Sequence, residues 1–113
     1  MTVAQIINQK GRSVVTAAPE VSLAEVAATL AEKRIGAVLI VEGDAIRGIV
    51  SERDIVRAMA KFGSEALRKL ASDCMTKKVI TCRPEDTIHD VMQKMTSGRF
   101  RHLPVVDQGR LVG

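Results

Sequence analysis

The sequence is almost free of aromatic residues: it has no Trp, no Tyr and only two Phe, Phe62 and Phe100. A core must therefore be built from Val, Ile, Leu, Ala and Met. The hydrophobic content of 46% in 113 residues supplies enough of them for one compact globular unit. The lack of Trp and Tyr also argues against a protein that binds single-stranded nucleic acid by stacking its bases.

Cysteines and long apolar runs are also scarce. Cys74 and Cys82 are the only cysteines, and neither has a CxxC partner or a histidine at metal-ligand spacing. We therefore expect two free thiols in a reducing compartment and no metal site. No apolar run approaches the ~20 residues that span a bilayer, and residues 1–10 lack the apolar segment of a signal peptide. The expectation is a cytoplasmic protein with no membrane partner.

Catalytic groups are few as well. The two histidines, His89 and His102, do not form a Ser–His–Asp-like arrangement with other residues. Cys82 lies beside Arg83, which is expected to lower the pKa of the thiol, but nothing nearby resembles a base or an oxyanion site. We predict that the chain is not an enzyme.

The net charge of +4 is compatible with nucleic acid, an acidic membrane or a nucleotide phosphate as partner. A basic nucleic-acid-binding protein is the alternative function, although no known reading motif is present. The cations that favour this alternative are Lys77, Lys78, Arg83, Arg99 and Arg101.

An internal repeat is the most informative feature of the sequence. A shift of 65 residues aligns the two halves without a gap, which predicts two structural copies. We divide the chain into a first repeat at 1–62, a connecting helical segment at 63–74 and a second repeat at 75–113. The identical pairs are Val14/Val79, Thr16/Thr81, Pro19/Pro84, Glu20/Glu85, Val26/Val91, Arg34/Arg99, Val41/Val106 and Gly48/Gly113.

Each copy begins with a short apolar strand and a helix. The strands are expected at 13–16 and 78–81, each followed by a proline. Ser22 and Thr87 are expected to cap the helices, with an acidic residue three positions later to complete a capping box. Apolar residues then recur at helical spacing, and we expect the methionines of the second helix, such as Met92, to fill the core.

A hairpin follows each helix. The β-branched runs 37–41 and 46–50 are separated by Gly43-Asp44, which is a tight-turn signal. In the second copy the run 103–106 leads to a turn near Gln108-Gly109, and Pro104, which donates no ladder hydrogen bond, should lie at the strand start or beside an edge.

The first copy continues into a helix that opens at Ser51, and a further helical segment is expected from Ser64 to Cys74. The second copy stops at Gly113, which aligns with Gly48. The predicted fold is α+β, with two pseudo-symmetric β-α-β-β-α repeats packed as a pair and the second truncated after its second strand turn. An incomplete sheet would expose backbone donors and apolar surface near Val105 and Leu111, so we expect this chain to self-associate more strongly than a version with a complete second copy, which sedimentation of the two would test.

The quoted runs resemble the signature of a cystathionine-β-synthase-type (CBS) domain. The first copy carries RIGAVLIV at 34–41 and GIVSERD at 48–54, and the second carries RFRHLPVVD at 99–107. The similarity covers nearly the whole chain. It looks most like the small stand-alone bacterial CBS-pair proteins, which have no enzyme domain attached.

The resemblance implies a cleft between the two copies that binds AMP, ADP, ATP or another adenosyl ligand. In the family, an Asp and a Ser or Thr of one copy hold the ribose, and the other copy holds base and phosphate. AMP or ATP is the ligand expected first, NADH or S-adenosylmethionine is the alternative, and no cofactor is required. The residues carried over to this site are Ser51, Asp54, Thr76, Ile80, Thr81, Arg101 and His102.

A second, incomplete site would draw on Thr16, Ala18, Gly36 and Ala37. Gly36 and Ala37 stand where the other site has Arg101 and His102, so this site has lost its positive charge. The family further implies a regulatory, energy-sensing module that forms a homodimer and acts on an unidentified protein.

The residues themselves allow two interpretations. A carboxylate at Asp54 can accept hydrogen bonds from both hydroxyls of a ribose, and cationic Arg101 suits a phosphate. Ser51-x-x-Asp54 is equally a helix cap, in which both side chains serve backbone N–H groups. Arg101 could be a surface side chain, and His102 a hydrogen-bonded packing residue.

Overall fold

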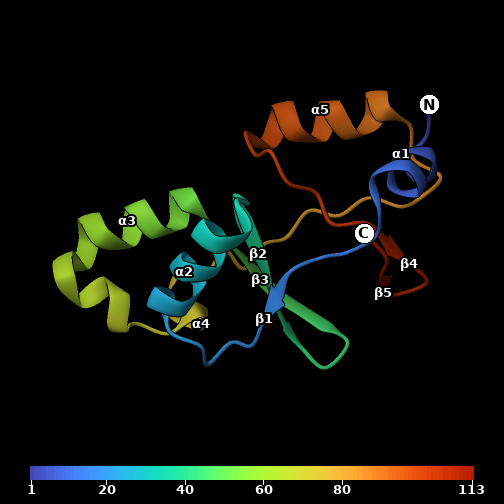
Figure 1. Ribbon diagram of the computed structural model, residues 1–113. Helices are drawn as coiled ribbons and strands as arrows, with labels where there is room; N and C mark the ends of the chain where they lie inside the picture. Colours follow the sequence, from blue (N-terminus) through green and yellow to red (C-terminus); the bar gives the residue numbers. More distant parts are fainter. The chain divides into compact units, whose positions relative to one another are not determined.

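The computed structural model describes residues 1–113 (Figure 1). The backbone contacts divide the chain into two compact units. The central unit is Val15–Val79, and the terminal unit combines Met1–Val14 with Ile80–Gly113. The sequence repeats and the compact units therefore divide the chain differently, because the first 14 residues pack with the second repeat.

The central unit is a three-stranded sheet with one helix between its first and second strands and three more helices after its third strand. The sheet order is β1-β2-β3, with β1 parallel and β3 antiparallel to β2. The elements are β1 Thr16–Ala17, α2 Leu23–Lys33, β2 Ala37–Glu42, β3 Ala45–Ser51, α3 Glu52–Phe62, the 3₁₀ helix η1 Gly63–Arg68 and α4 Ala71–Cys74.

The predicted hairpin is confirmed. Gly43 adopts a φ of 60° in the two-residue turn, a conformation that favours glycine. The register between β2 and β3 shifts after Ile40, which leaves Arg47 as a bulged residue. As the middle strand of the sheet, β2 is buried at three consecutive positions, Val38 to Ile40.

The helix caps form as predicted at both copies. The Ser22 hydroxyl accepts the Glu25 N–H at 3.2 Å, which is one of the two bonds of a capping box, and Thr87 forms both bonds with Asp90. Behind its cap, α2 buries one face into a core with both hairpin strands. That core consists of Leu23, Val26, Leu30, Val38, Ile40, Val50, Ala58, Ala66 and Ala71.

The helical segment expected from Ser64 to Cys74 is interrupted. Helix η1 ends at Arg68, and the chain is extended at Lys69 and Leu70 before α4 begins. Backbone pairing explains the interruption, because the Lys69 carbonyl accepts the Leu23 N–H at 2.8 Å and Leu70 bridges Ser22. A helical Leu70 could not make this bridge.

The segment after α4 lies against β3 at Gly48. A Cβ at that position would stand 2.6 Å from Met75 Sδ and 2.8 Å from the Thr76 carbonyl oxygen. Thr76 also exchanges two backbone hydrogen bonds with Ile49, at 3.0 and 2.8 Å. Glycine is therefore required at position 48, because a backbone and a methionine pack directly onto it.

The terminal unit has a smaller sheet. Its elements are α1 Val3–Lys10, α5 Ile88–Gly98, β4 Val106–Asp107 and β5 Arg110–Leu111. The two short strands pair antiparallel around a turn at Gln108 and Gly109, both with positive φ, as the turn prediction required. Pro104 directly precedes the residues that pair, which agrees with its expected place at a strand start.

Both predicted first strands are displaced. The first strand is confined to Thr16–Ala17 instead of 13–16, and 78–81 forms no strand. In the second copy only Cys82 pairs, as a parallel bridge to Val105, in the same register as Ala17 with Ile40. Val15 packs against the central core and accepts the Leu39 N–H at 3.2 Å, but the apolar residues before these positions belong to no strand, so composition placed the strands too early.

The prediction that Met92 fills the core is also wrong, because 60% of its surface is exposed. Its neighbour Val91 and Met95 are half-buried, and α5 has no fully buried residue. Successive helix positions are rotated by about 100°, so Met92 lies outside the narrow face, containing Val91 and Met95, with which α5 packs against the rest of its unit.

Helix α1 was not predicted, and it has the same role in the terminal unit as α4 in the central unit. Each begins by donating two backbone N–H groups to the segment that precedes a capped helix. The bonds are Val3 to Asp86 (2.9 Å), Ala4 to Pro84 (2.8 Å), Ala71 to Val21 (2.7 Å) and Ser72 to Pro19 (3.0 Å). The two units are thus pseudo-symmetric down to individual hydrogen bonds.

If α1 completes the terminal unit, truncation of its buried side chain should destabilise that unit. Ile7 is 7% exposed and packs in a cluster with Val3, Cys82 and Val105. We expect Ile7→Ala to lower the free energy of unfolding by about 2–4 kcal/mol in urea titrations. Hydrogen exchange should accelerate at Val105. The matched control is Ile6→Ala, which removes the same atoms from a half-buried position. Equal losses from both variants would contradict the assignment.

Candidate functional site

Asp54 is the only buried charged residue of the protein, with 5% of its surface exposed. It lies in the first turn of α3, after the hairpin strand β3 has ended at Ser51. A buried carboxylate is destabilising unless donors surround it. The donors around Asp54 therefore define the candidate site.

Four donor groups reach the Asp54 carboxylate. Oδ2 accepts the Ser51 backbone N–H at 2.8 Å and the Ser51 hydroxyl at 3.0 Å. Oδ1 accepts the Thr76 hydroxyl at 2.8 Å and Arg57 Nη1 at 3.3 Å. Ser51 and Asp54 form a capping box, so the helix-cap interpretation is confirmed. Thr76 is the one donor that comes from outside the α3 region.

Three of the seven residues predicted for the main site thus meet in the central unit: Ser51, Asp54 and Thr76. The other four belong to the terminal unit. There Arg101 and His102 are exposed in the connection after α5, so His102 is not a packing residue of the core. Thr81 is half-buried, and its carbonyl oxygen accepts Lys94 Nζ at 3.0 Å, while Ile80 is 36% exposed.

The residues predicted for the second site all lie in the central unit: Thr16, Ala18, Gly36 and Ala37. The Gly36 carbonyl oxygen accepts the Glu52 N–H at 3.1 Å, and Ala37 pairs with Ser51 across the hairpin. Gly36 and Ala37 therefore lie beside the start of α3. None of the four side chains carries a positive charge, and weak phosphate binding there stays a prediction.

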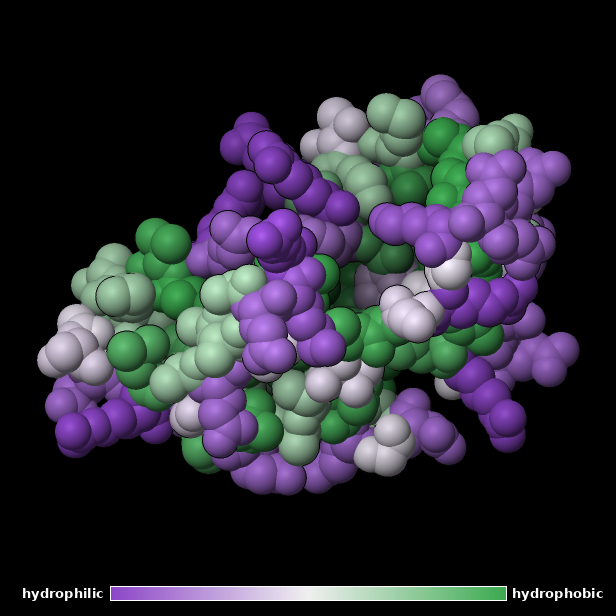
Figure 2. Space-filling model, viewed as in Figure 1, coloured by the Kyte–Doolittle hydropathy of each residue, from purple (hydrophilic) through white to green (hydrophobic).

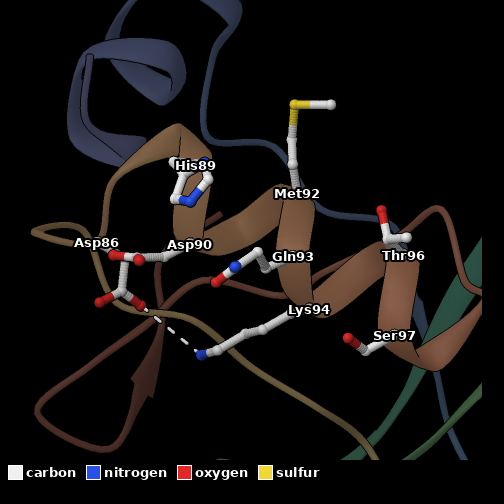
Figure 3. A pocket seen from close by; sticks show the side chains of 8 residues that line it. All are labelled: Asp86, His89, Asp90, Met92, Gln93, Lys94, Thr96 and Ser97. Carbon is white, nitrogen blue, oxygen red and sulfur yellow. Dashed lines mark ion pairs between the residues drawn. The ribbon is translucent and has the colours of Figure 1, made fainter.

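A surface hollow lies along α5, and none of the predicted site residues lines it (Figure 3). An ion pair between Lys94 Nζ and Asp86 Oδ2, 3.9 Å long, crosses one side of it. His89 is exposed there. The hydroxyl and backbone N–H of Thr87 donate to Asp90 and lower the pKa of that carboxyl group. The hollow is lined by Asp86, His89, Asp90, Met92, Gln93, Lys94, Thr96 and Ser97.

Neither cysteine is activated. The expectation of a lowered pKa for Cys82 is wrong, because burial and the nearby Asp86 raise the pKa of its thiol. The pKa of Cys74 is raised by its own burial and by Asp73. Both thiols are free. No group of three or more His, Cys, Asp or Glu is placed to hold a metal ion.

Arg57 is the residue of the Asp54 cluster that sequence reasoning missed. Its guanidinium pairs with Asp54 at i,i+3 spacing, and its side chain is 65% exposed. The spacing alone would have indicated contact on one helix face.

A family model for the CBS domain matches residues 3–61 and 71–113, and the chain therefore belongs to the CBS-domain family as a tandem pair. It is similar to the CBS-domain containing protein ATU1752 from Agrobacterium tumefaciens, with 43% identity and a TM-score of 0.97 over 100% of this chain and 90% of that one. The CBS domain-containing protein YhcV of Bacillus subtilis is 29% identical over 88% of this chain and 71% of its own length.

The chain spans only about half of another relative. It covers 53% of the uncharacterized protein MK0525 of Methanopyrus kandleri, which is 35% identical over 90% of this chain. No helix in the structure has the length and apolar character needed to cross a membrane.

Two similar solved structures contain adenosine derivatives. The CBS domain protein PAE2072 from Pyrobaculum aerophilum is complexed with AMP; it is 26% identical, with a TM-score of 0.85 over 99% of this chain and 83% of that one. The CBS domain pair of protein MJ0100 is in complex with 5′-methylthioadenosine and S-adenosyl-L-methionine. It is 28% identical, with a TM-score of 0.85 over 100% of this chain and 86% of that one.

The Thr76 hydroxyl should contribute measurably to stability, because it donates to a buried charge. We expect Thr76→Val to lower the free energy of unfolding by about 1.5–3 kcal/mol in urea titrations, and Thr76→Ser to restore most of it. Thr29→Val is the control, since the Thr29 hydroxyl donates only to the Glu25 backbone carbonyl within its own helix. A loss no larger than that of Thr29→Val would show that the bond to Asp54 is not stabilising.

Proposed function

We propose that this chain is a regulatory module that binds an adenosine nucleotide and has no catalytic activity of its own. The observation that carries the proposal is the Asp54 carboxylate, buried and oriented by Ser51 and Thr76. The AMP complex of a 26% identical CBS protein supports the choice of ligand.

The chemistry of a ribose fits this carboxylate. Its two vicinal hydroxyls are donors, and charge-assisted hydrogen bonds to a carboxylate are stronger than neutral ones. The Ser51 bonds fix the orientation of Asp54, so the ligand need not order the side chain as it binds. A carboxylate oriented in advance favours affinity, provided that a ribose hydroxyl displaces one of the donors that already occupy it.

The remaining site residues are proposed from the family resemblance. Ile80 would flank the adenine, and Thr81 with the backbone would read the adenine edge. Exposed Arg101 and His102 would supply positive charge and donors for phosphate. AMP or ATP remains the ligand expected first, with NADH and S-adenosylmethionine as alternatives.

The regulatory part of the proposal requires a partner. Apolar residues reach the surface over α3 and η1, seen as green surface at the left of Figure 2. Val56 is 67%, Met59 49% and Leu67 41% exposed. This surface supports the predicted homodimer, because exposed apolar area favours association. Nucleotide binding would then shift an existing equilibrium of the pairs or of a regulated protein.

The alternative of nucleic-acid binding rests on the net charge of +4. Arg101 is exposed, as a phosphate contact requires, but the helices and strands carry no recognised reading motif. Binding of a duplex or single strand that weakens steeply with salt would favour this alternative.

Thermal or urea unfolding with added AMP tests the proposal. A ligand present at 100 times its Kd should raise the free energy of unfolding by about 2.7 kcal/mol. We expect Asp54→Asn to weaken AMP binding by about tenfold or more, because a charge-assisted acceptor is lost.

The control for this variant is Asp90→Asn, since Asp90 has the same capping-box position in α5 but lies outside the proposed site. Circular dichroism should verify that both variants remain folded, and Ser51→Ala provides a second site variant. Wild-type affinity in folded Asp54→Asn would mean that the ribose does not bind this carboxylate.

A further inference from the structure

The Asp54 carboxylate has no acceptor position left for a ligand. A carboxylate offers about four lone-pair positions. Oδ2 accepts two bonds from Ser51, and Oδ1 accepts one each from Thr76 and Arg57. If Asp54 binds ribose, as the proposed function requires, one of these donors must leave.

Three of the four donors are held firmly. The Ser51 bonds are 2.8 and 3.0 Å long and belong to the cap of α3. The Thr76 hydroxyl lies 2.8 Å from Oδ1, and its residue is tied to Ile49 by two backbone hydrogen bonds. Both residues are anchored by backbone hydrogen bonds, so releasing Asp54 would require rotating a hydroxyl out of a bond of 2.8 or 3.0 Å.

Arg57 is the donor that can be displaced. Its contact with Oδ1 is the longest of the four, at 3.3 Å, and its side chain is 65% exposed while that of Asp54 is 5% exposed. An ion pair whose cation is so exposed contributes little free energy, because water solvates the released guanidinium. Displacement leaves the backbone unchanged.

We propose that Arg57 is a specificity-determining residue, whose guanidinium yields Asp54 Oδ1 to a ribose hydroxyl and pairs instead with the phosphate of the ligand. The inference rests on the proposed function and narrows its ligand class. A guanidinium binds phosphate through a planar fork of donors. The exchange therefore replaces the Asp54 carboxylate by the ligand phosphate as the anionic partner of Arg57.

The exchange discriminates among adenosine derivatives by charge. When a phosphorylated nucleotide displaces the Arg57 guanidinium from Asp54, its own phosphate provides a new anionic partner for that guanidinium. Adenosine and 5′-methylthioadenosine return none. S-adenosylmethionine has a net positive charge, and its one carboxylate is accompanied by a sulfonium and an ammonium group that repel a displaced cation. The site therefore selects AMP-type ligands over nucleosides and sulfonium ligands.

The test is Arg57→Gln in the full chain, with AMP, adenosine and S-adenosylmethionine titrated in a calorimeter. Removing the competitor should tighten adenosine binding by about two- to fivefold. Removing the phosphate partner should weaken AMP binding by about five- to tenfold. The ratio of AMP to adenosine affinity should thus fall at least about tenfold, and S-adenosylmethionine should gain relative to AMP.

The matched control is Arg47→Gln, which makes the same charge change at a 56% exposed arginine whose ion pair with Glu42 lies in the hairpin. It should leave the ratio unchanged, and Arg57→Lys should give an intermediate ratio. An unchanged ratio in Arg57→Gln, or equal weakening of AMP and adenosine, would overturn this inference and leave the proposed function intact. Failure of all three ligands to bind the wild-type protein would overturn the proposed function itself.

Discussion

Each compact unit of this chain is completed by a short helix from the start of one CBS match. Helix α4 begins the second match but packs in the central unit, and α1 begins the first match but packs in the terminal unit. The backbone N–H groups of α4 donate to Val21 and Pro19, and those of α1 donate to Asp86 and Pro84. The carbonyls that accept these bonds precede a capped helix and have no sheet partner of their own, so the exchanged helix satisfies them. The rest of the architecture depends on this exchange, because it aligns the segment after α4 with β3.

The candidate site is a direct product of that alignment. Thr76 reaches Asp54 only because its segment pairs with Ile49 and packs over Gly48. The same contacts that make a buried carboxylate tolerable also preorganise it as an acceptor. In the proposed site, stability and ligand recognition would therefore depend on the same hydrogen bonds, of which the Arg57 bond is the longest and has the most exposed donor.

The sequence was sufficient to predict the elements that are long enough to show helical apolar spacing, a helix cap or a turn signal. Helices α2, α3 and α5 and the first hairpin were found from caps, apolar spacing and Gly43. The short elements were missed or misplaced, because a two-residue strand or a four-residue α4 has too few residues for a pattern. Helix α1 did carry a signal, the capping box of Thr2 with Gln5.

For the site, the CBS resemblance identified Ser51, Asp54 and Thr76, which the structure brings together. It did not identify Arg57, because the importance of that residue depends on how many donors already surround one carboxylate in space. The number of donors around the Asp54 carboxylate follows from distances in the structure and not from the spacing of residues in the sequence.

The mismatch between repeat and folding unit has a consequence for how such chains arise. Val15–Val79 is one continuous stretch, whereas the terminal unit consists of two separate segments. A gene encoding a single ancestral copy would have had a leading helix but no second copy to receive it. Two such chains could complete each other by domain swapping, and duplication would then have placed the contacts of the swapped dimer within a single chain.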